Sequence, residues 1–514
     1  MRKNSAVVLA IDHGTSGMKT ALVNLHGEVI QTASYPTKLI FTSDGGVEQS
    51  GTNWIQAVEK SIALLYHNKQ EYRKKTIALC ISSTFSTTVA VDKQGNALSI
   101  LTWLDARAAK GIRKKFGGKF LGYSFFKILP FLYYTGGGPT LSGKDDLAHI
   151  LFWKDEKPEI YEKAQFFLPS KDYLNFVLTG NVFATYDSMA LFWLTNNRNP
   201  NSIQYQNRLL KLSSIEKEKL PPLVSSTYCI GKLLPKWQKK WNLPPLPIFA
   251  GSADLPAACI GSGCTENFQP HLYVGTSSWI LAHTPWRKTD PAHAIACLPA
   301  AIEGKYYAAN EQDMAGGALE KVCSWLFSET ERKQKNFFQK LEKEASNVAP
   351  SKNNLLFIPW LNGEKTPLDN ENVRGSFLGL HVQHSKAHLI RAVYEGIALN
   401  SKWLLFYLEK FLKRNFSTLP FIGGGATSSL WCQIYADVLQ KEIRPLQNPQ
   451  AANARGAAIL ALVGLGEGDF SYFSAKTKFT KSYQPNKELA DLYEKKLFVL
   501  KKYAKNKSLN QLFF

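Results

Sequence analysis

Ala6-Val-Val-Leu-Ala-Ile11 runs directly into Asp12-His-Gly-Thr-Ser-Gly17, and this joining of an apolar run to a Gly-Thr-Ser turn decides the fold. The apolar run has the length and composition of a buried strand. The same arrangement returns about half a chain later, where Gly275-Thr-Ser277 stands between apolar residues from Leu272 to Ile280. Two copies in the same strand–turn–strand context indicate two related domains, each carrying one such turn.

Strands and helices are predicted on either side of each turn. Further strands are expected over Met18–Asn24 and Glu28–Tyr35. Apolar residues recur at helical spacing over Asn53–His67, Ala387–Phe411 and Leu430–Leu439. A chain of 514 residues is too long for one core, which favours two domains. Together with the repeated turn and the mixture of strands and helices, this predicts a duplicated α/β fold with a cleft between its halves.

A proline-rich stretch marks the expected boundary between the halves. Asn242-Leu-Pro-Pro-Leu-Pro247 has the composition of a stiff connector. We therefore predict one domain over residues 1–246 and a second over residues 247–514.

The composition is that of an ordinary globular protein, with 45% hydrophobic and 20% charged residues. The nearest approach to a membrane span, around Phe120–Tyr134, is interrupted by Lys127 and Pro130, so we predict no membrane partner. Met1–Ser5 leads directly into the first strand, which predicts no secretory signal peptide and a cytoplasmic protein. The seven cysteines are scattered without metal-ligand spacing, so buried free thiols are expected.

The formal net charge of +21 raises the question of an anionic partner. A nucleic-acid module concentrates its basic residues on one element, whereas here they are spread. Only modest clusters occur, at Arg73-Lys-Lys75, at Lys236–Lys240 and from Lys495 to Lys507. We predict a solvated basic surface and no nucleic-acid partner, with binding of an anionic partner as the alternative.

The two Gly-Thr-Ser turns carry the first chemical prediction. Such a turn exposes successive backbone N–H groups and two hydroxyls, which form a small anion site. Two facing turns could hold a polyphosphate between the domains, and a plain β-turn is the alternative for either copy. The predicted phosphate ligands are Gly14, Thr15, Ser16, Gly275, Thr276 and Ser277.

Two aspartates stand beside these elements. Asp12, immediately before the first turn, is suited to orient a water on a magnesium ion that accompanies a polyphosphate. Asp254 follows a short predicted strand, Pro247–Ala250, and precedes a predicted helix. The local pattern favours a helix cap at Asp254, because Pro256 lies just inside the first turn, and a catalytic carboxylate is the alternative.

Small residues recur in two later stretches. Gly423-Gly-Gly-Ala426 follows a predicted strand, Leu419–Ile422, and would let a flat ring lie against bare backbone at a helix N-terminus. Ala451-Ala-Asn-Ala-Arg-Gly-Ala-Ala458 begins another helix. Its small residues favour close helix packing, with a nucleotide wall that includes Asn453 as the alternative.

Three segments then decide between these interpretations. Gly375-Ser-Phe-Leu-Gly-Leu380 is followed after seven residues by His388-Leu-Ile-Arg-Ala-Val-Tyr-Glu395, and Pro359-Trp-Leu-Asn-Gly-Glu-Lys-Thr-Pro367 precedes both. The first two resemble the C-terminal signature of the FGGY carbohydrate kinases, and the third resembles the Gly-Glu-Arg-Thr-Pro segment of the same family. The resemblance covers nearly the whole chain. It implies two ribonuclease-H-like domains of the actin and hexokinase type, and it argues against a chaperone or filament ATPase, which lacks this signature.

The resemblance also implies roles for residues of this sequence. Asp12 through Lys19 is similar to the first phosphate motif, Gly275-Thr-Ser277 to the second, and Gly423–Ala426 to the adenosine motif. Gly424, Gly425, Ala426 and Asn453 are the residues expected at the nucleotide. Asp254 matches the catalytic base, and Trp103-Leu-Asp105-Ala-Arg107 resembles a stretch that forms the sugar pocket. The implied ligands are ATP, Mg²⁺ and a small sugar.

Departures from the family pattern affect the choice of sugar. Xylulokinases carry Met-His where this sequence has Phe85-Ser86, and the asparagine that often follows the catalytic aspartate is Leu255 here. We expect a ketose kinase, most nearly one for D-xylulose, with D-ribulose or another ketose or polyol as alternatives. An inactive sugar- and nucleotide-binding sensor is the alternative from another class, and the choice between monomer and homodimer stays open.

Overall fold

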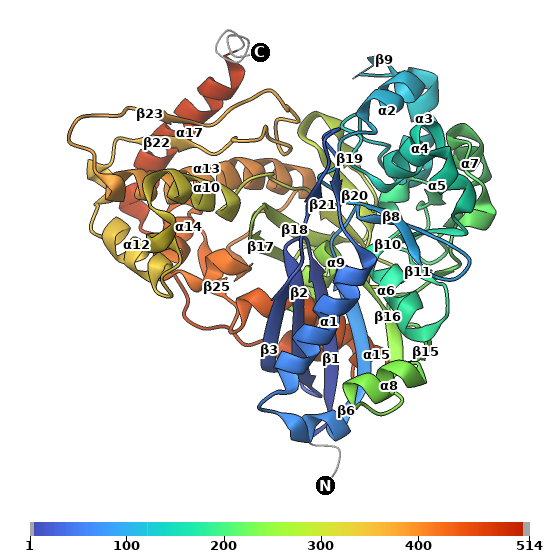
Figure 1. The fold of residues 1–514 in the computed structure, drawn as a ribbon. Coiled ribbons are helices and arrows are strands. Elements are labelled where there is room, and N and C mark those ends of the chain that lie inside the picture. The colour runs from blue at the N-terminus through green and yellow to red at the C-terminus, as the bar shows by residue number, and fades with distance from the viewer. Residues whose placement is uncertain (1–4, 121, 507–514) are drawn as a thin grey trace.

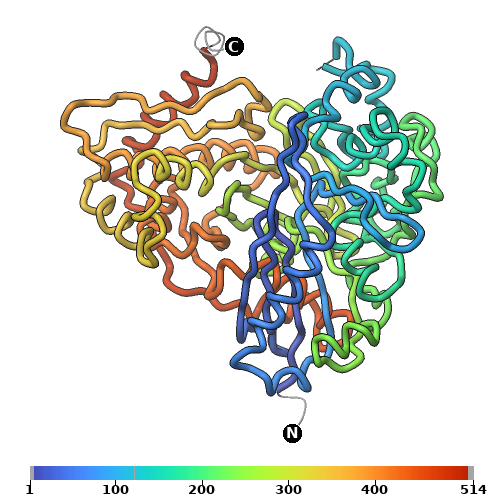
Figure 2. Tube along the Cα trace, viewed as in Figure 1, coloured from blue at the N-terminus to red at the C-terminus, as the bar shows by residue number. Residues whose placement is uncertain are grey.

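The computed structural model describes residues 5–120 and 122–506, which form two lobes (Figures 1 and 2). Each lobe contains a large mixed sheet. The first has the order β15 (Cys229–Lys232), β16 (Pro247–Ala253), β6 (Thr76–Ser83), β1 (Val7–Gly14), β2 (Gly17–Asn24), β3 (Val29–Pro36). The second has the order β19 (Thr289–Asp290), β20 (Ile295–Pro299), β21 (Tyr306–Ala309), β18 (Ser278–Thr284), β17 (Pro270–Val274), β24 (Thr418–Ile422), β25 (Glu442–Pro445).

The two sheets repeat one topology. In the first, β1 pairs antiparallel with β2 and parallel with β6, and β6 pairs parallel with β16. In the second, β17 pairs antiparallel with β18 and parallel with β24, and β24 pairs parallel with β25. Each Gly-Thr-Ser turn joins the corresponding first two strands. The duplicated α/β fold predicted from the sequence is therefore confirmed.

Smaller sheets complete the strands. A five-stranded sheet has the order β10 (Phe166–Pro169), β7 (Thr88–Val91), β8 (Ala97–Leu101), β5 (Val47–Glu48), β4 (Ile40–Phe41). Three two-stranded sheets pair β11 (Ala184–Thr185) with β14 (Leu223–Val224), β12 (Thr195–Asn196) with β13 (Gln204–Tyr205), and β22 (Leu356–Ile358) with β23 (Ser376–Leu378). A short strand, β9 (Gly117–Phe120), lies between helices α2 and α3.

The helices cover the faces of these sheets. In the first half of the chain they are α1 (Gly51–Tyr66), α2 (Ala109–Phe116), α3 (Phe125–Thr135), α4 (Asp146–Glu156), α5 (Pro158–Lys163), α6 (Ser170–Thr179), α7 (Asn207–Ser213), α8 (Pro235–Trp241) and α9 (Asp254–Gly261). In the second half they are α10 (Gly316–Leu326), α11 (Glu329–Arg332), α12 (Phe337–Ser346), α13 (Lys386–Leu412), α14 (Ser429–Leu439), α15 (Ala452–Gly464), α16 (Phe470–Ala475) and α17 (Ala490–Lys505).

The central strand β1 is buried on both faces, and its side chains alternate between two helices. Val7, Leu9 and Ile11 belong to a cluster with Trp54 of α1. Val8 and Ala10 belong to another cluster with α15, whose contribution is largely alanine. A helix from the second half of the chain therefore covers one face of the first sheet.

Two helices far apart in the sequence, α9 and α15, touch at backbone distance. A Cβ added at Gly456 would lie 2.0 Å from the carbonyl oxygen of Ala257, and one at Gly261 would lie 1.8 Å from that of Ala452. Only glycine fits at both positions. The close helix packing that the sequence favours for Ala451–Ala458 is thus confirmed.

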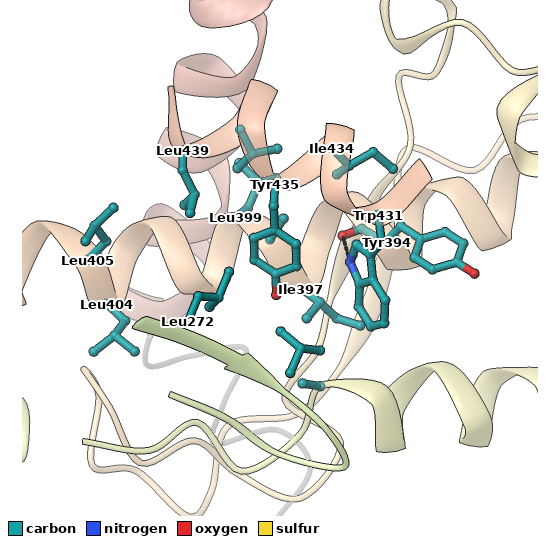
Figure 3. Close-up of a cluster of buried hydrophobic side chains, with 14 of the residues drawn as sticks. Leu272, Tyr394, Ile397, Leu399, Leu404, Leu405, Trp431, Ile434, Tyr435 and Leu439 are labelled. Carbon is teal, nitrogen blue, oxygen red and sulfur yellow. Dashed lines mark hydrogen bonds between the residues drawn. The ribbon is translucent and has the colours of Figure 1, made fainter. Parts of the chain in front are cut away.

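The core of the second lobe forms around α13. Figure 3 shows Tyr394 and Ile397 of this helix beside Trp431 and Tyr435 of α14, with Leu272 of β17 below them. The Trp431 indole N–H donates to the carbonyl oxygen of Tyr394 at 3.3 Å.

The signature residue Glu395 also has a structural role in this lobe. Its buried carboxylate pairs with Arg391 at 2.9 Å and with Lys496 of α17 at 2.6 Å. This part of the signature therefore fastens the last helix to α13.

Other expectations from the sequence have mixed outcomes. The three predicted helices correspond to α1, α13 and α14 within two residues. Six cysteines are buried as predicted, whereas Cys229 is exposed. The last strand of the first sheet is β16 and the first strand of the second sheet is β17, so the chain passes from one sheet to the other after the predicted boundary at 246/247. The division into two domains stays a prediction. In residues 5–120 and 122–506, every helix is too short or too polar to cross a membrane.

The α9–α15 contact yields a stability prediction. We expect Gly456→Ala to lower the free energy of unfolding by about 2 kcal/mol or more, because the added methyl must push the two backbones apart. Gly111→Ala in α2 is the matched control, since its Cβ would meet only Asp155 Oδ2, at 3.9 Å. Denaturant unfolding of both variants tests this, and equal effects would contradict it.

Candidate active site

A cleft of about 1460 Å³ is lined by residues of both halves of the chain. Most residues singled out from the sequence line it: Asp12, Gly14, Thr15, Ser16, Lys19, Phe85, Ser86, Trp103, Asp254, Gly275, Thr276, Ser277, Gly424, Gly425 and Asn453. Asp105 and Ala426 are not among the lining residues. The fold thus brings together groups that lie more than 400 positions apart in the sequence.

The first Gly-Thr-Ser turn is held from the side of the predicted sugar pocket. The indole N–H of Trp103 donates to Thr15 Oγ1 at 2.8 Å, and the side-chain amide of Gln49 donates to the Thr15 carbonyl oxygen at 3.0 Å. The first turn and Trp103 are therefore held in a fixed position relative to each other.

The second turn is held by the start of α10. The backbone N–H of Gly316 donates to the Gly275 carbonyl oxygen at 2.8 Å, and that of Ala315 donates to Thr276 at 2.8 Å. Gly316 itself lines the cleft. The Gly275 N–H donates to the Ser277 carbonyl oxygen at 2.9 Å. Both turns, with their hydroxyls, line the same space, which an extended anion such as a polyphosphate could occupy.

Asp12 lies at the end of β1 and is almost completely buried. Its Oδ1 accepts from the Ser82 hydroxyl at 2.9 Å, and its Oδ2 lies 4.0 Å from Lys19 Nζ. Burial raises the pKa of Asp12, although Lys19, Ser82 and Asn453 each lower it. A nearby cation stabilises the ionised form of Asp12.

The donor set around Asp12 fits a magnesium ion that arrives with phosphates. Among the described residues, no cluster of three or more His, Cys, Asp or Glu could hold a metal alone. Mg²⁺ in nucleotide sites keeps several waters and takes one or two carboxylates plus substrate phosphates. A single carboxylate beside the first turn meets that requirement.

Asp254 is the first residue of α9, and it does not cap the helix. The N-cap is Ala253, which has no side-chain hydrogen bond, and the Asp254 Oδ1 accepts from the N–H of Leu255 at 2.9 Å. Burial raises the pKa of Asp254 well above its usual range, and repulsion by Asp12 and Glu311 raises it further. The cap interpretation favoured by the local sequence is wrong, and the carboxylate is available at the cleft.

A residue that the sequence analysis missed supports this helix start. Asp187 is fully buried, and its Oδ2 accepts from the backbone N–H of Ala253 at 2.8 Å. Its Oδ1 accepts from the Ser226 hydroxyl at 2.9 Å. Asp187 therefore fixes the residue directly before Asp254, and no motif in the sequence signals this.

Phe85 and Ser86 lie in the loop between β6 and β7 and line the cleft. Ser86 is buried and has a φ of 51°, in the left-handed region. Backbone hydrogen bonding from Phe85 lowers the pKa of Asp254 against the larger effect of burial, so this loop contacts the carboxylate. Phe85 also packs partly against the core.

Asp105 has no open face toward the cleft. Its Oδ2 accepts from the backbone N–H of Val47 at 2.9 Å and from the Arg107 guanidinium at 2.7 Å. Arg107 also pairs with Glu48 and Asp44, at 2.6 and 2.9 Å. The predicted sugar contact of Asp105 is therefore not supported. The carboxylate instead holds the strand and loop that carry Trp103.

The glycines after β24 form another wall. Gly423 has a φ of 89°, and a Cβ there would meet the Val274 carbonyl oxygen at 2.4 Å, so only glycine fits. At Gly424 the nearest atom to an added Cβ is Gln450 Nε2, at 4.0 Å, so bare backbone faces open space. Ala426 is buried in the core of the second lobe, outside this wall.

Two further groups at the cleft escaped the sequence analysis. Lys365 Nζ pairs with Glu311 at 2.8 Å, and both residues line the cleft. Lys365 lies in the motif Pro359–Pro367, but no role could be assigned to it from the sequence alone. Tyr307 of β21 is fully buried, and its hydroxyl has no partner among the described residues. A buried, unpaired hydroxyl at a cleft wall calls for a water or a ligand group.

Comparisons with known proteins agree over nearly the whole chain. Two domain models of the FGGY family of carbohydrate kinases match it, the N-terminal one over residues 7–261 and the C-terminal one over residues 272–465. A xylulose kinase from Staphylococcus epidermidis is 30% identical over 95% of this chain and 94% of its own length. A gluconokinase from Bacillus subtilis is 26% identical over 95% and 94%. The crystal structure of a ligand-bound xylulose kinase from Lactobacillus acidophilus has a TM-score of 0.82 at 25% identity, covering 97% of both chains.

Proposed function

Because the chain belongs to the FGGY family of carbohydrate kinases, we propose that it transfers the γ-phosphoryl group of ATP to a hydroxyl of a ketose, most specifically a pentulose such as D-xylulose. The observation that carries the proposal is that both Gly-Thr-Ser turns and the Asp254 carboxylate line one cleft. The names of the relatives support a xylulose acceptor, although a gluconokinase is almost as similar.

Asp254 acts as the general base. It accepts the proton of the sugar hydroxyl as that oxygen attacks the γ-phosphorus, while the bond to the β-phosphate oxygen breaks. The raised pKa of Asp254 suits this task, because a more basic carboxylate takes the proton more readily. Its support by Leu255 and by Asp187 through Ala253 keeps the carboxylate oriented.

The two turns bind the phosphate chain. Their backbone N–H groups and the hydroxyls of Thr15, Ser16, Thr276 and Ser277 donate to phosphate oxygens, and Lys19 adds a positive charge. Mg²⁺, held through Asp12, supplies charge neutralisation on the phosphates when it is bound. Phosphoryl transfer needs this positioning and charge stabilisation more than covalent help.

The nucleotide base lies on the wall formed by Gly424 and Gly425. Bare backbone at Gly424 leaves space for a flat ring. Asn453, near the start of α15, lines the same cleft and sits close enough to Asp12 to lower its pKa. Closure of the lobes around both substrates would exclude water and suppress ATP hydrolysis.

The first prediction separates catalysis from folding. We expect Asp254→Asn to leave the fold intact and to lower kcat by about 10²-fold or more, because asparagine has the same shape but cannot take the proton. Asp491→Asn, which makes the same charge change near the start of α17, is the control. Steady-state phosphorylation of D-xylulose and thermal unfolding are measured for both variants.

The pH dependence gives this prediction a second readout. A base must be deprotonated, so kcat/KM falls as pH is lowered through the raised pKa of Asp254. Because Glu311 helps to raise that pKa, Glu311→Gln should move the acid limb to lower pH. Near-normal turnover in Asp254→Asn would show that Asp254 is not the general base. If the wild type phosphorylates no acceptor at all, the alternative of an inactive sugar- and nucleotide-binding sensor would be favoured.

The second prediction concerns the nucleotide. Gly424→Val should raise the Kd of a non-hydrolysable ATP analogue by about tenfold or more, because its side chain occupies the space of the ring. Sugar binding should survive, since the substitution meets no other residue closely. Calorimetric titration measures both affinities, with Gly111→Val as a control. An unchanged nucleotide affinity would place the adenine elsewhere.

The third prediction concerns the sugar. Phe85→Met with Ser86→His should raise kcat/KM for D-xylulose relative to D-ribulose, D-gluconate and polyols by about tenfold, because the imidazole adds a hydrogen-bonding partner for a sugar hydroxyl. Histidine tolerates the left-handed backbone of position 86 better than most residues. If the order of kcat/KM values among the acceptors is unchanged by the double substitution, Phe85 and Ser86 contribute to packing alone.

A further inference from the structure

A cluster of exposed apolar side chains stands at one corner of the first lobe. It consists of Phe120 of β9 with Phe125, Phe126 and Leu129 of α3, which we call the aromatic tip. Phe126 is 82% exposed. The ring centroids of Phe120 and Phe125 lie 5.2 Å apart and those of Phe125 and Phe126 5.5 Å apart, so the rings form one patch. Figures 1 and 2 show β9, α2 and α3 at the upper right, where the chain projects from the lobe.

The folding of α3 does not account for this patch. Ile128 and Phe131 already bury one side of the helix. Phe120 of the tip lines the cleft together with Tyr123, Ile128 and Leu132, whereas Phe125, Phe126 and Leu129 do not. A helix that is apolar on every side is normally buried on every side. A contiguous exposed apolar patch on a folded protein marks an interaction site.

Positive charge predominates in the chain segment that carries the aromatic tip, although Glu371 and Asp155 also lie beside α2. Residues 106–144 contain eight lysines and arginines and no aspartate or glutamate. Five of these are exposed near the tip: Lys110, Arg113, Lys114, Lys119 and Lys127. Arg113 has a long ion pair with Glu371, at 3.8 Å. For the other four, no carboxylate of the described residues lies within 4.0 Å of Nζ.

We propose that the aromatic tip docks the enzyme on a membrane surface that contains anionic phospholipid. Phenylalanine and leucine side chains enter the boundary between headgroups and acyl chains, while the surrounding lysines remain at the charged headgroups. The enzyme would lie on the membrane without crossing it, in agreement with the absence of a spanning helix in the described residues. The proposal departs from our sequence-based expectation of no membrane partner and does not depend on the acceptor sugar.

Two other occupants fit the patch less well. A second copy of the chain would bring two clusters of unpaired lysines together, and like charges disfavour that contact. Single-stranded nucleic acid stacks its bases on separate aromatic faces along a groove. Here the phenylalanines pack edge-on against one another at interplanar angles of 84° and 82°, on a projection.

Vesicle sedimentation tests the proposal with the full-length protein. We expect binding to vesicles in which about a third of the lipid is phosphatidylglycerol to be at least about tenfold tighter than binding to pure phosphatidylcholine, and to weaken with added salt. Phe125→Ser with Phe126→Ser should reduce binding to the anionic vesicles by about tenfold or more. Lys114→Glu with Lys119→Glu should do the same without touching the apolar residues.

The matched control is Phe498→Ser in α17. Phe498 is 59% exposed and lies beneath Lys502, so it is also an exposed phenylalanine on a lysine-rich helix. Figure 1 shows α17 at the upper left, away from α3 at the upper right. This variant should bind vesicles as the wild type does. Kinase turnover and thermal unfolding should stay unchanged in all variants, because none of these residues belongs to the phosphoryl-transfer site.

Several results would overturn the proposal. Equal binding to neutral and anionic vesicles, or equal loss of binding in the control and tip variants, would remove the tip as an anionic-lipid site. Tip-dependent self-association in sedimentation velocity, without vesicle binding, would assign the patch to a second copy. Tip-dependent binding of a labelled single-stranded oligonucleotide, again without vesicle binding, would assign it to nucleic acid.

Discussion

The contact between α9 and α15 is the constraint on which the rest of the structure depends. Gly261 and Gly456 let the two backbones meet, so two helices from distant parts of the sequence pack without side chains between them. Both helices begin at the cleft, α9 with Asp254 and α15 next to Asn453. The same α15 covers the face of β1 that ends in Asp12. One packing contact therefore fixes the relative positions of three polar groups drawn from three distant parts of the sequence.

These polar groups are held against their own electrostatic preference. Burial raises the pKa of both Asp12 and Asp254, and repulsion by Asp12 and Glu311 raises that of Asp254 further, while Lys19 only partly offsets the effect of burial at Asp12. Such an arrangement costs stability in the free protein and becomes favourable when a cation and hydrogen-bonding ligands enter. The surrounding fold supplies the rigidity, through Asp187 behind Ala253 and through Glu395, which fastens α17 to α13. The ionised carboxylates of the site are thus destabilised by their surroundings, and residues outside the cleft hold the elements that carry them in place.

The sequence predicted the repeated turns, their strands and the long α13, because local periodicity and turn chemistry decide these features. It could not predict that α15 would cover the first sheet, since periodicity shows that a helix has an apolar face but not which sheet receives it. Local patterns also misled at single residues. Asp254 resembles a cap, yet Ala253 holds that position. The sugar role of Asp105 came from the family resemblance, and the structure shows its carboxylate bonded to Arg107. Tyr307 and Asp187 have no local signal, because tertiary packing alone gives them their places.

The placement of α15 has a consequence for the newly made chain as it leaves the ribosome. All six strands of the first sheet are complete at Ala253, yet the helix that covers one face of β1 ends only at Gly464. At a synthesis rate of roughly 5–20 residues per second, the intervening stretch takes about ten to forty seconds to appear. During that interval Val8, Ala10 and their neighbours lack their covering helix. Transiently exposed apolar surface of this kind favours aggregation, so the face of β1 that α15 covers is the part of the first sheet most open to association with other chains until α15 has emerged.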